Sequence, residues 1–288
     1  MSYQSVFRPG LFAGKTIIVT GGGSGIGRCT AHELAALGAK VALVGRKAEK
    51  VEAVKAEILE DDGTASAHVC DIREEESVKA TVKAIIAEHG GLNGVVNNAG
   101  GQFPSPLANI NQKGWETVVR TNLTGGFLMA REAYTQALSK TGGAIVNIVA
   151  DMWGGMPGMG HSGAARAGMV NFTRTAAVEW ACSGVRVNAV APGWVASSGM
   201  DNYPEHMKQW IRSLGDNVPI KRMGTESEIS AAICFLISPG AAFINGDCLR
   251  VDGGASQGGR VWPFPKAKNN EPFNGFHRAV TPKVLSED

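Results

Sequence analysis

Short apolar runs alternate with longer segments of helical periodicity from residue 16 to about residue 190. The runs are rich in β-branched residues and nearly continuous in apolar character, which is typical of parallel strands covered on both faces. Strands are predicted at residues 16–20, 40–44, 65–69, 92–96, 144–149 and 185–190, with a short last strand at 249–251. The alternation indicates repeated βαβ units.

Helices are predicted between these strands, at residues 25–37, 49–61, 74–89, 112–139 and 162–182. Another is predicted at residues 226–237, with Thr225 as its N-cap and Ser238-Pro239-Gly240 as its stop signal. The predicted fold class is therefore α/β: a Rossmann-like doubly wound parallel sheet of about seven strands with helices on both faces.

The chain shows no internal repeat and no Pro- or Ser-rich linker before residue 253. We therefore expect a single dinucleotide-binding domain over residues 1–254, including a substrate lid at 194–218, and a C-terminal extension at 255–288. The extension has two interpretations. It is a poorly ordered tail, or it docks on its own or a neighbouring subunit to bury its aromatic side chains, which are Trp262, Phe264, Phe273 and Phe276.

Composition narrows the function classes. The 288 residues carry 28 Lys and Arg against 26 Asp and Glu, a net charge of +2, which gives no support for a nucleic-acid partner. No apolar run is long enough to span a bilayer, and the N-terminus has no secretory pattern. The five cysteines are odd in number and scattered, so we expect reduced thiols and a cytoplasmic location. The histidines show no metal-ligand spacing, and no metal is predicted.

Glycine is in excess, with 38 residues, and part of that excess lies in Thr20-Gly21-Gly22-Gly23-Ser24-Gly25-Ile26-Gly27. This stretch follows a predicted strand and opens a predicted helix. Glycines there allow a tight turn and a close approach of the backbone to a pyrophosphate, and the helix N-terminus offers free N–H groups to the phosphates. The context predicts a dinucleotide site.

The glycine spacing resembles that of the short-chain dehydrogenase/reductase family, as do Asn97-Asn98-Ala99-Gly100, Thr121-Asn122 and Pro192-Gly193. The resemblance covers about residues 12 to 255 and implies a homotetramer with the long helices at its interface. The cofactor-binding residues that we expect are Gly21, Gly23, Ser24, Gly25, Ile26, Gly27, Arg46, Lys47, Asp71, Ile72, Asn98, Ala99, Gly100, Arg166, Pro192, Gly193 and Val195.

The end of the second strand decides between the two nicotinamide cofactors, because an acidic side chain there would accept a hydrogen bond from the ribose 2′-hydroxyl. The residues are Gly45-Arg46-Lys47, two cations and no carboxylate. A 2′-phosphate, and so NADP(H), is predicted. Asp71 resembles the acid that contacts adenine in the family, although it is equally suited to cap the next helix.

The family's usual Tyr-x-x-x-Lys pair is missing. None of the three tyrosines has Lys four residues later; Ser162 and Arg166 stand at the matching places, and Ala150 replaces the usual serine. Asn122 alone remains of the usual set. Alcohol chemistry needs a proton to move at oxygen, and Arg166 is too weak an acid for that. Reduction of a C=C bond conjugated to a thioester instead needs donors for charge developing on oxygen, a demand that Ser162 and Arg166 meet.

The stretch from His161 to Gly168, with Gly100-Gly101-Gln102-Phe103, resembles the family branch of peroxisomal trans-2-enoyl-CoA reductase and 2,4-dienoyl-CoA reductase. That branch implies fatty-acid metabolism. Val170 stands where the enoyl-CoA reductase has a tyrosine, so that tyrosine's role does not transfer. The chain is also similar to bacterial dehydrogenases of citronellol and acyclic-terpene breakdown.

We therefore predict an oxidoreductase that reduces enoyl- or dienoyl-CoA with NADP(H). The alternatives are a terpene alcohol or aldehyde dehydrogenase and a catalytically silent NADP-binding protein. Candidate catalytic residues are Asn122, Ser162, Arg166, His161 and Asp151. His161 and Asp151 are candidates for proton transfer, but each could instead satisfy backbone groups. An acyl pocket could include Met152, Trp153, Met156, Met159, Trp194 and Met200.

Overall fold

The fold is taken from a computed structural model, which describes residues 2–257 and 270–286. Its centre is a seven-stranded, fully parallel sheet in the order β3-β2-β1-β4-β5-β6-β7. The strands are β1 (Thr16–Thr20), β2 (Lys40–Gly45), β3 (Thr64–Val69), β4 (Gly94–Asn97), β5 (Gly143–Ile148), β6 (Val185–Pro192) and β7 (Cys248–Val251). The predicted sheet is confirmed, with shifts of one or two residues at the strand ends.

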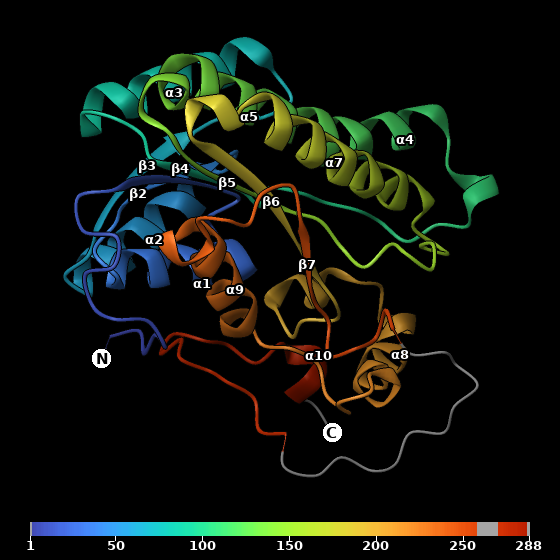
Figure 1. Cartoon of the computed structure of the whole chain (residues 1–288). Helices are drawn as coiled ribbons and strands as arrows, with labels where there is room; N and C mark the ends of the chain where they lie inside the picture. The colour runs from blue at the N-terminus through green and yellow to red at the C-terminus, as the bar shows by residue number, and fades with distance from the viewer. Residues whose placement is uncertain (1, 258–269, 287–288) are drawn as a thin grey trace.

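Helices cover both faces of the sheet (Figure 1). One face carries α1 (Gly25–Ala36), α2 (Ala48–Glu60) and α9 (Glu226–Ile237). The other carries α3 (Glu75–His89), α4 (Gln112–Val119), α5 (Gly125–Ala133) and α7 (Gly160–Glu179). Apolar cores lie between the sheet and each layer, which explains the nearly continuous apolar strands.

The helix predicted at residues 112–139 has a different construction. It runs as α4, a π-helical turn at Arg120–Thr124, α5, a second π-helical turn at Tyr134–Leu138 and the short α6 (Ser139–Thr141). A π-turn inserts one extra residue into the helical register, a feature that period-based prediction does not resolve. The first of these turns contains Asn122.

Shorter helical segments complete the chain. They are η1 (Leu107–Asn109), η4 (Ala181–Ser183), η5 (Ser198–Asn202), η6 (Glu205–Met207), α8 (Lys208–Arg212), η7 (Leu214–Asn217), η8 (Pro239–Ala241) and α10 (Lys283–Ser286). Thr225 caps α9 through a capping box with Glu228, and the helix ends at Ile237, as predicted. The helix expected in the lid is divided among η6, α8 and η7.

The described part of the C-terminal extension docks on its own chain and passes beneath α1 and α9 (Figure 1). Phe276 is 3% exposed; it stacks on Tyr3, and the Arg28 guanidinium lies over its ring. Phe273 accepts a hydrogen bond from Thr225 through its carbonyl. Trp262 and Phe264 lie outside the described residues. The interpretation of a docked extension is therefore correct for residues 270–286.

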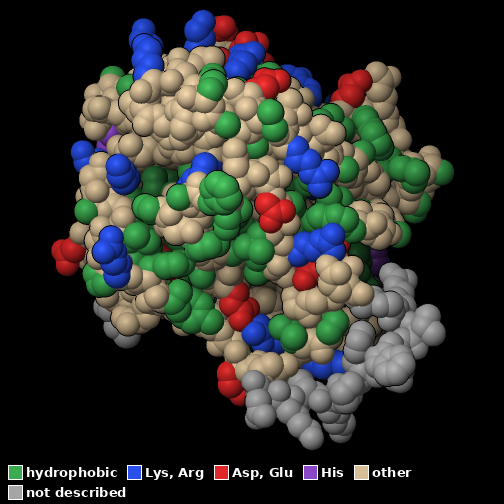
Figure 2. All heavy atoms as spheres, viewed as in Figure 1, with side chains coloured by type: hydrophobic (Ala, Val, Ile, Leu, Met, Phe, Trp, Pro, Cys, Tyr) green, Lys and Arg blue, Asp and Glu red, His purple; other side chains and the backbone are tan. Residues whose placement is uncertain are grey.

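Basic and acidic side chains are dispersed together over the face drawn in Figure 2. Within the described ranges, no helix combines the length and apolar character needed to cross a membrane.

Candidate active site

A continuous groove crosses the carboxyl ends of the strands. Two cavities, of about 260 and 510 Å³, share Ile26, Asn98, Gly100 and Ser197 among their lining residues. The smaller lies at the ends of β1, β2 and β3, and the larger extends over β5 and β6 to the lid. The groove begins where the strand order reverses between β1 and β4, the place where doubly wound sheets bind ligands.

Most of the predicted cofactor residues line this groove. The smaller cavity is lined by Gly21, Ser24, Ile26, Arg46, Asp71, Ile72, Asn98, Ala99 and Gly100. The larger is lined by Arg166, Pro192, Gly193 and Val195, together with residues shared with the smaller one. Gly23, Gly25, Gly27 and Lys47 are not among the lining residues; the three glycines shape the turn, and Lys47 stands at the N-cap of α2.

The glycine-rich turn packs tightly against its neighbours only because side chains are missing there. Gly21 has φ +66°, and a Cβ atom on it would lie 2.9 Å from the Cα of Ala99. A Cβ atom on Gly27 would collide with the Gly21 carbonyl. The α1 N-cap Ser24 makes no side-chain cap hydrogen bond, which leaves the first N–H groups of α1 free to bind a ligand. This cradle fits a pyrophosphate.

The end of the groove at β2 is basic. Arg46 lies directly after β2 and lines the smaller cavity beside Arg73. Asp71 accepts hydrogen bonds from Arg73, with Nε to Oδ1 at 2.9 Å, and these bonds lower the pKa of Asp71 to about 2. Asp71 does not cap α3, since Glu74 occupies the N-cap, so the capping interpretation is wrong. Arg73 was missed because the sequence pattern says nothing about a cation four residues beyond the third strand.

Asn122 is anchored to the loop that follows β4. Its Oδ1 accepts from the Gly101 N–H at 2.9 Å, and its Nδ2 donates to the Gly101 carbonyl at 2.9 Å. The π-turn of Arg120–Thr124 presents this side chain, which belongs to a residue only 2% exposed. Asn122 Nδ2 also lies 3.4 Å from Ser162 Oγ, so it joins the loop to α7.

Ser162 is wholly buried, and its hydroxyl donates to Gln102 Oε1 over 2.6 Å. Gln102 lines the larger cavity, which makes it the polar link between Ser162 and the space for a substrate. From the sequence, Gln102 was named only as part of a stretch that resembles the enoyl-CoA reductase branch, and not as a site residue. Nothing in a spacing of 60 residues along the chain could indicate the contact.

Arg166 lies one helical turn after Ser162 on α7 and lines the larger cavity. Its Nη1 donates to the Ile148 carbonyl at 2.7 Å, while its buried Nε has no hydrogen-bond partner. Burial lowers the pKa of Arg166 to about 10. Among residues 2–257 and 270–286, no carboxylate forms an ion pair with it. A buried cation without a counter-ion favours a ligand that carries or develops negative charge.

His161 and Asp151 are placed less favourably. His161 is fully buried; its Nδ1 accepts from the Ser162 N–H at 2.8 Å, and its ring meets Phe103 edge to face. The Asp151 carboxyl accepts a hydrogen bond from the Trp153 backbone, although burial raises the pKa of Asp151. Neither is among the described residues that line the larger cavity. Their roles in proton transfer therefore stay predictions.

The lid closes the far side of the larger cavity. Trp194 crosses Trp210 edge to face at 5.3 Å between ring centroids, and Met200 and Tyr203 complete the wall. Tyr203 brings the only phenol among the described lining residues, and the sequence pattern did not single it out. The other expected acyl-pocket residues lie elsewhere: Met156 packs on Gly163, Trp153 lies under Arg250, and neither Met152 nor Met159 is among the lining residues.

These features define a class: a Rossmann-like α/β protein whose glycine cradle and cavity are suited to a dinucleotide and a small substrate. The family described as Enoyl-(Acyl carrier protein) reductase matches residues 21–256. The chain belongs to the short-chain dehydrogenase/reductase family of oxidoreductases.

Two relatives point to different substrates. The chain is 37% identical over 244 residues to a probable 2,4-dienoyl-CoA reductase of Bacillus subtilis, covering 83% of this chain and 96% of the relative. It is 66% identical to a citronellol catabolism dehydrogenase of Pseudomonas aeruginosa, whose structure aligns with a TM-score of 0.80 over 88% of this chain and 100% of the other.

A third relative was solved with cofactor. The structure of a single-substitution variant of actinorhodin polyketide ketoreductase with NADPH aligns at a TM-score of 0.81 and 30% identity, over 87% of this chain and 100% of the other. The family binds nicotinamide cofactors, and the groove described above has the form that such a cofactor needs.

Proposed function

We propose that this protein reduces the C=C bond of an enoyl- or dienoyl-CoA thioester with NADP(H). The observation that carries the proposal is Arg166: a buried cation without a carboxylate partner among the described residues, at the base of the larger cavity, where the family normally has a lysine that works with a tyrosine. With no tyrosine at Ser162, the site is better suited to stabilise charge than to move a proton at oxygen.

The chain's own residues would hold the cofactor along the groove. The turn Gly21–Gly27 and the start of α1 would receive the pyrophosphate, and Arg46 would bind the 2′-phosphate in a forked contact. A bound nicotinamide supplies the hydride. Absence of a carboxylate at the end of β2 supports NADP(H) over NAD(H).

Charge would develop on the thioester oxygen as the β-carbon is reduced. The Arg166 guanidinium lies in a site screened from water, so its attraction for that oxygen is stronger than in solution. Gln102 lines the cavity and accepts from the Ser162 hydroxyl through Oε1, so its amide N–H groups can turn towards a bound oxygen, and Asn122 keeps the loop in place. The α-carbon then needs a proton, for which Tyr203 and water are the available sources on the cavity wall.

The similarity to a citronellol catabolism dehydrogenase, at 66% identity, favours a second candidate, which is oxidation of an acyclic terpene alcohol or aldehyde. Such chemistry would require a base for the hydroxyl proton. Tyr203 offers a phenol on the cavity wall, as the family's tyrosine does, but it lies in the lid segment rather than on α7.

The test is a pair of assays on the purified protein. With NADPH and 2-decenoyl-CoA, the first candidate predicts loss of NADPH absorbance and a saturated acyl-CoA product. With NADP⁺ and citronellol, the second candidate predicts a gain in absorbance as NADPH is formed. If only the gain is seen, the enoyl proposal is wrong. If NADPH binds and neither reaction occurs with these or with a 2,4-dienoyl-CoA, the protein is a silent NADP-binding protein.

We also propose a cytoplasmic homotetramer. All five cysteines are free thiols, which suits a reducing compartment. Trp115 on α4 and Phe127 on α5 are 38% and 37% exposed, and a second copy covering this face would bury them. Light scattering after size exclusion checks the mass; a monomer at micromolar concentration would contradict the assembly.

A further inference from the structure

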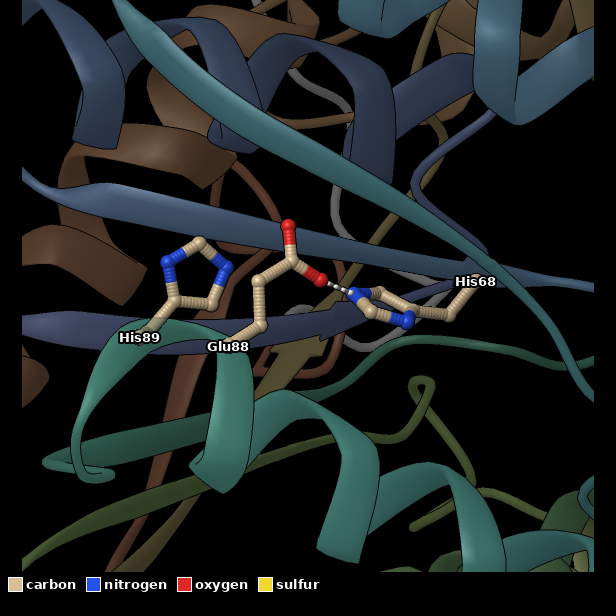
Figure 3. Close-up of side chains that lie close together, drawn as sticks. All are labelled: His68, Glu88 and His89. Atoms are coloured by element: carbon tan, nitrogen blue, oxygen red, sulfur yellow. Dashed lines mark ion pairs between the residues drawn. The ribbon is translucent and has the colours of Figure 1, made fainter.

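Three side chains with metal-ligating atoms meet between β3 and the end of α3 (Figure 3). His68 comes from β3, and Glu88 and His89 come from the last turn of α3. Their ligand atoms all lie within 4.8 Å of one another. In Figure 3 the Glu88 carboxylate lies between the two imidazole rings.

The fold brings these residues together through local geometry. Ser66 and His68 are two residues apart on an edge strand, so they point to the same face of the sheet. The Ser66 hydroxyl, of a residue 4% exposed, lies 2.8 Å from Nε2 of both His68 and His89. The same nitrogen of each ring therefore converges on one point.

Two imidazoles and one carboxylate form the donor set of many zinc sites. Ligand bonds of about 2.0–2.1 Å place tetrahedral donors about 3.3 Å apart. His68 Nε2 and Glu88 Oε2 are 3.7 Å apart, and the Glu88 side chain is 53% exposed. This pair is already close to the spacing of a zinc site, and the exposed Glu88 side chain is free to rotate towards an ion. The Ser66 hydroxyl or a water would complete the coordination.

The surroundings of His68 and His89 keep both imidazole rings neutral and able to bind a metal ion. Burial lowers the pKa of both His68 and His89, so both are neutral near pH 7 and each has a lone pair to offer. The charged groups that face them are Glu88 on α3, Glu52 and Lys55 on α2, and Lys40 on β2. Glu88 would offset part of the charge of a bound cation.

We propose that His68, His89 and Glu88 bind one divalent transition-metal ion of the zinc class. The ion would fasten the edge strand β3 to the C-terminal turn of α3. The sequence pattern indicated no metal because the ligands come from two successive elements, β3 and α3, and follow no His-x-x-His spacing. The competing account is a hydrogen-bonded cluster that binds no ion.

Calorimetric titration of the full-length, chelator-treated protein with Zn²⁺ alone tests the proposal. We expect one equivalent per chain and, with Co²⁺, the visible absorption of a tetrahedral ion. His89→Ala and Glu88→Gln should each weaken Zn²⁺ binding by more than about 100-fold. His206→Ala is the matched control, because His206 is exposed on the lid and outside the cluster.

The thermal midpoint gives an independent readout. Saturating Zn²⁺ should raise it in the wild type and in His206→Ala, but not in Glu88→Gln, whose exposed side chain can be replaced without harm to the fold. Absence of Zn²⁺ binding in the wild type, or equal binding by wild type and His89→Ala, overturns the proposal. Neither result depends on the enzymatic activity.

Discussion

Gly100 leaves the space that the guanidinium of Arg166 occupies: a Cβ atom on Gly100 would lie 2.5 Å from Arg166 Nη2 and 3.1 Å from Asn122 Oδ1. A glycine at this position is therefore needed to accommodate the Arg166 side chain as well as the backbone turn. The adjacent Gly101 has no atom within 4 Å of its virtual Cβ.

Gly100→Ala should displace Arg166 and lower both the thermal midpoint and the affinity for NADPH. Gly101→Ala provides the matched control, since its methyl group points into open space. We expect a drop in the midpoint of about 2–4 °C for each kcal/mol lost in the first variant and little change in the second. Calorimetry and fluorescence titration with NADPH measure the two effects. Equal midpoints for the two variants would show that Arg166 is not held against Gly100.

Arg166→Met removes a cation that burial disfavours and keeps the side-chain volume. Arg166 has no carboxylate partner among the described residues, and the substitution removes one hydrogen bond, to the Ile148 carbonyl, so the thermal midpoint should change little. Turnover of enoyl-CoA should fall by about 10²–10³-fold, the cost typical of losing a donor to a developing oxyanion. Steady-state kinetics at saturating NADPH separate this loss from weaker cofactor binding. Wild-type turnover by the variant would remove Arg166 from the mechanism.

Arg46→Asp should reverse the cofactor preference. A charge-assisted contact to phosphate contributes about 1.5–3 kcal/mol, so affinity for NADPH should fall by about 10–100-fold or more, with NADH affected far less. Lys47→Asp is the control, because Lys47 does not line the cavity. Binding titrations with both cofactors measure the change. Parallel losses for NADPH and NADH in Arg46→Asp would rule out a role for Arg46 at the 2′-phosphate.

Tyr203→Phe tests the source of the proton. If the phenol delivers it, turnover should fall by about 10²–10⁴-fold, and the solvent isotope effect on the remaining rate should change. Tyr134→Phe is the control: Tyr134 stacks on Trp180, and its hydroxyl pairs with Ser183, away from the groove. Full activity in Tyr203→Phe would leave water as the donor.

Asp61→Asn should loosen the C-terminal extension. Burial alone would raise the pKa of Asp61, but hydrogen bonds from Arg278 and the nearby His277 and His32 reverse this and lower it. A lowered pKa means stability that is present above the unfolded value of 3.8 and is lost as pH falls through the folded value.

The thermal midpoint of Asp61→Asn should therefore lie about 5 °C or more below wild type at pH 7, and the difference should vanish towards pH 2. Asp62→Asn is the control: the neighbour is exposed and outside these contacts, and asparagine tolerates its positive φ of 62°. A gap between wild type and Asp61→Asn that persists unchanged in acid would contradict an ionic origin.

Much of the fold follows from sequence because parallel strands need two covered faces. That requirement alone makes Ile17, Ile18 and Val19 a continuous apolar run, and the spacing of such runs predicts the sheet. The glycine-rich turn could also be predicted from the sequence, since its backbone conformation excludes most side chains. Asn122 was found by resemblance, but the π-turn that presents it was not, because one extra residue barely disturbs the apolar period.

Contacts between segments that are distant in the chain could not be predicted from the sequence, and they limit how much of the site was predicted. Ser162 and Arg166 were singled out because they stand where the family has its tyrosine and lysine, whereas Gln102 and Tyr203 enter the site through loops whose paths depend on tertiary packing. The same limit applies to His68 and His89, which belong to neighbouring elements but share no sequence period.

Hydrogen bonds and apolar packing join the lid segment to α10. The Val284 N–H donates to Asp201 Oδ1 at 3.1 Å, and Arg212 Nε donates to the Val284 carbonyl at 2.8 Å, so α10 is bonded to two points within the segment 194–218. Val284 itself is 1% exposed, packed among lid residues. Any movement of this segment away from the groove would have to carry α10 along or break these bonds. A change at the buried Val284 should therefore be felt at Met200 and Tyr203, which belong to the same apolar cluster and line the larger cavity.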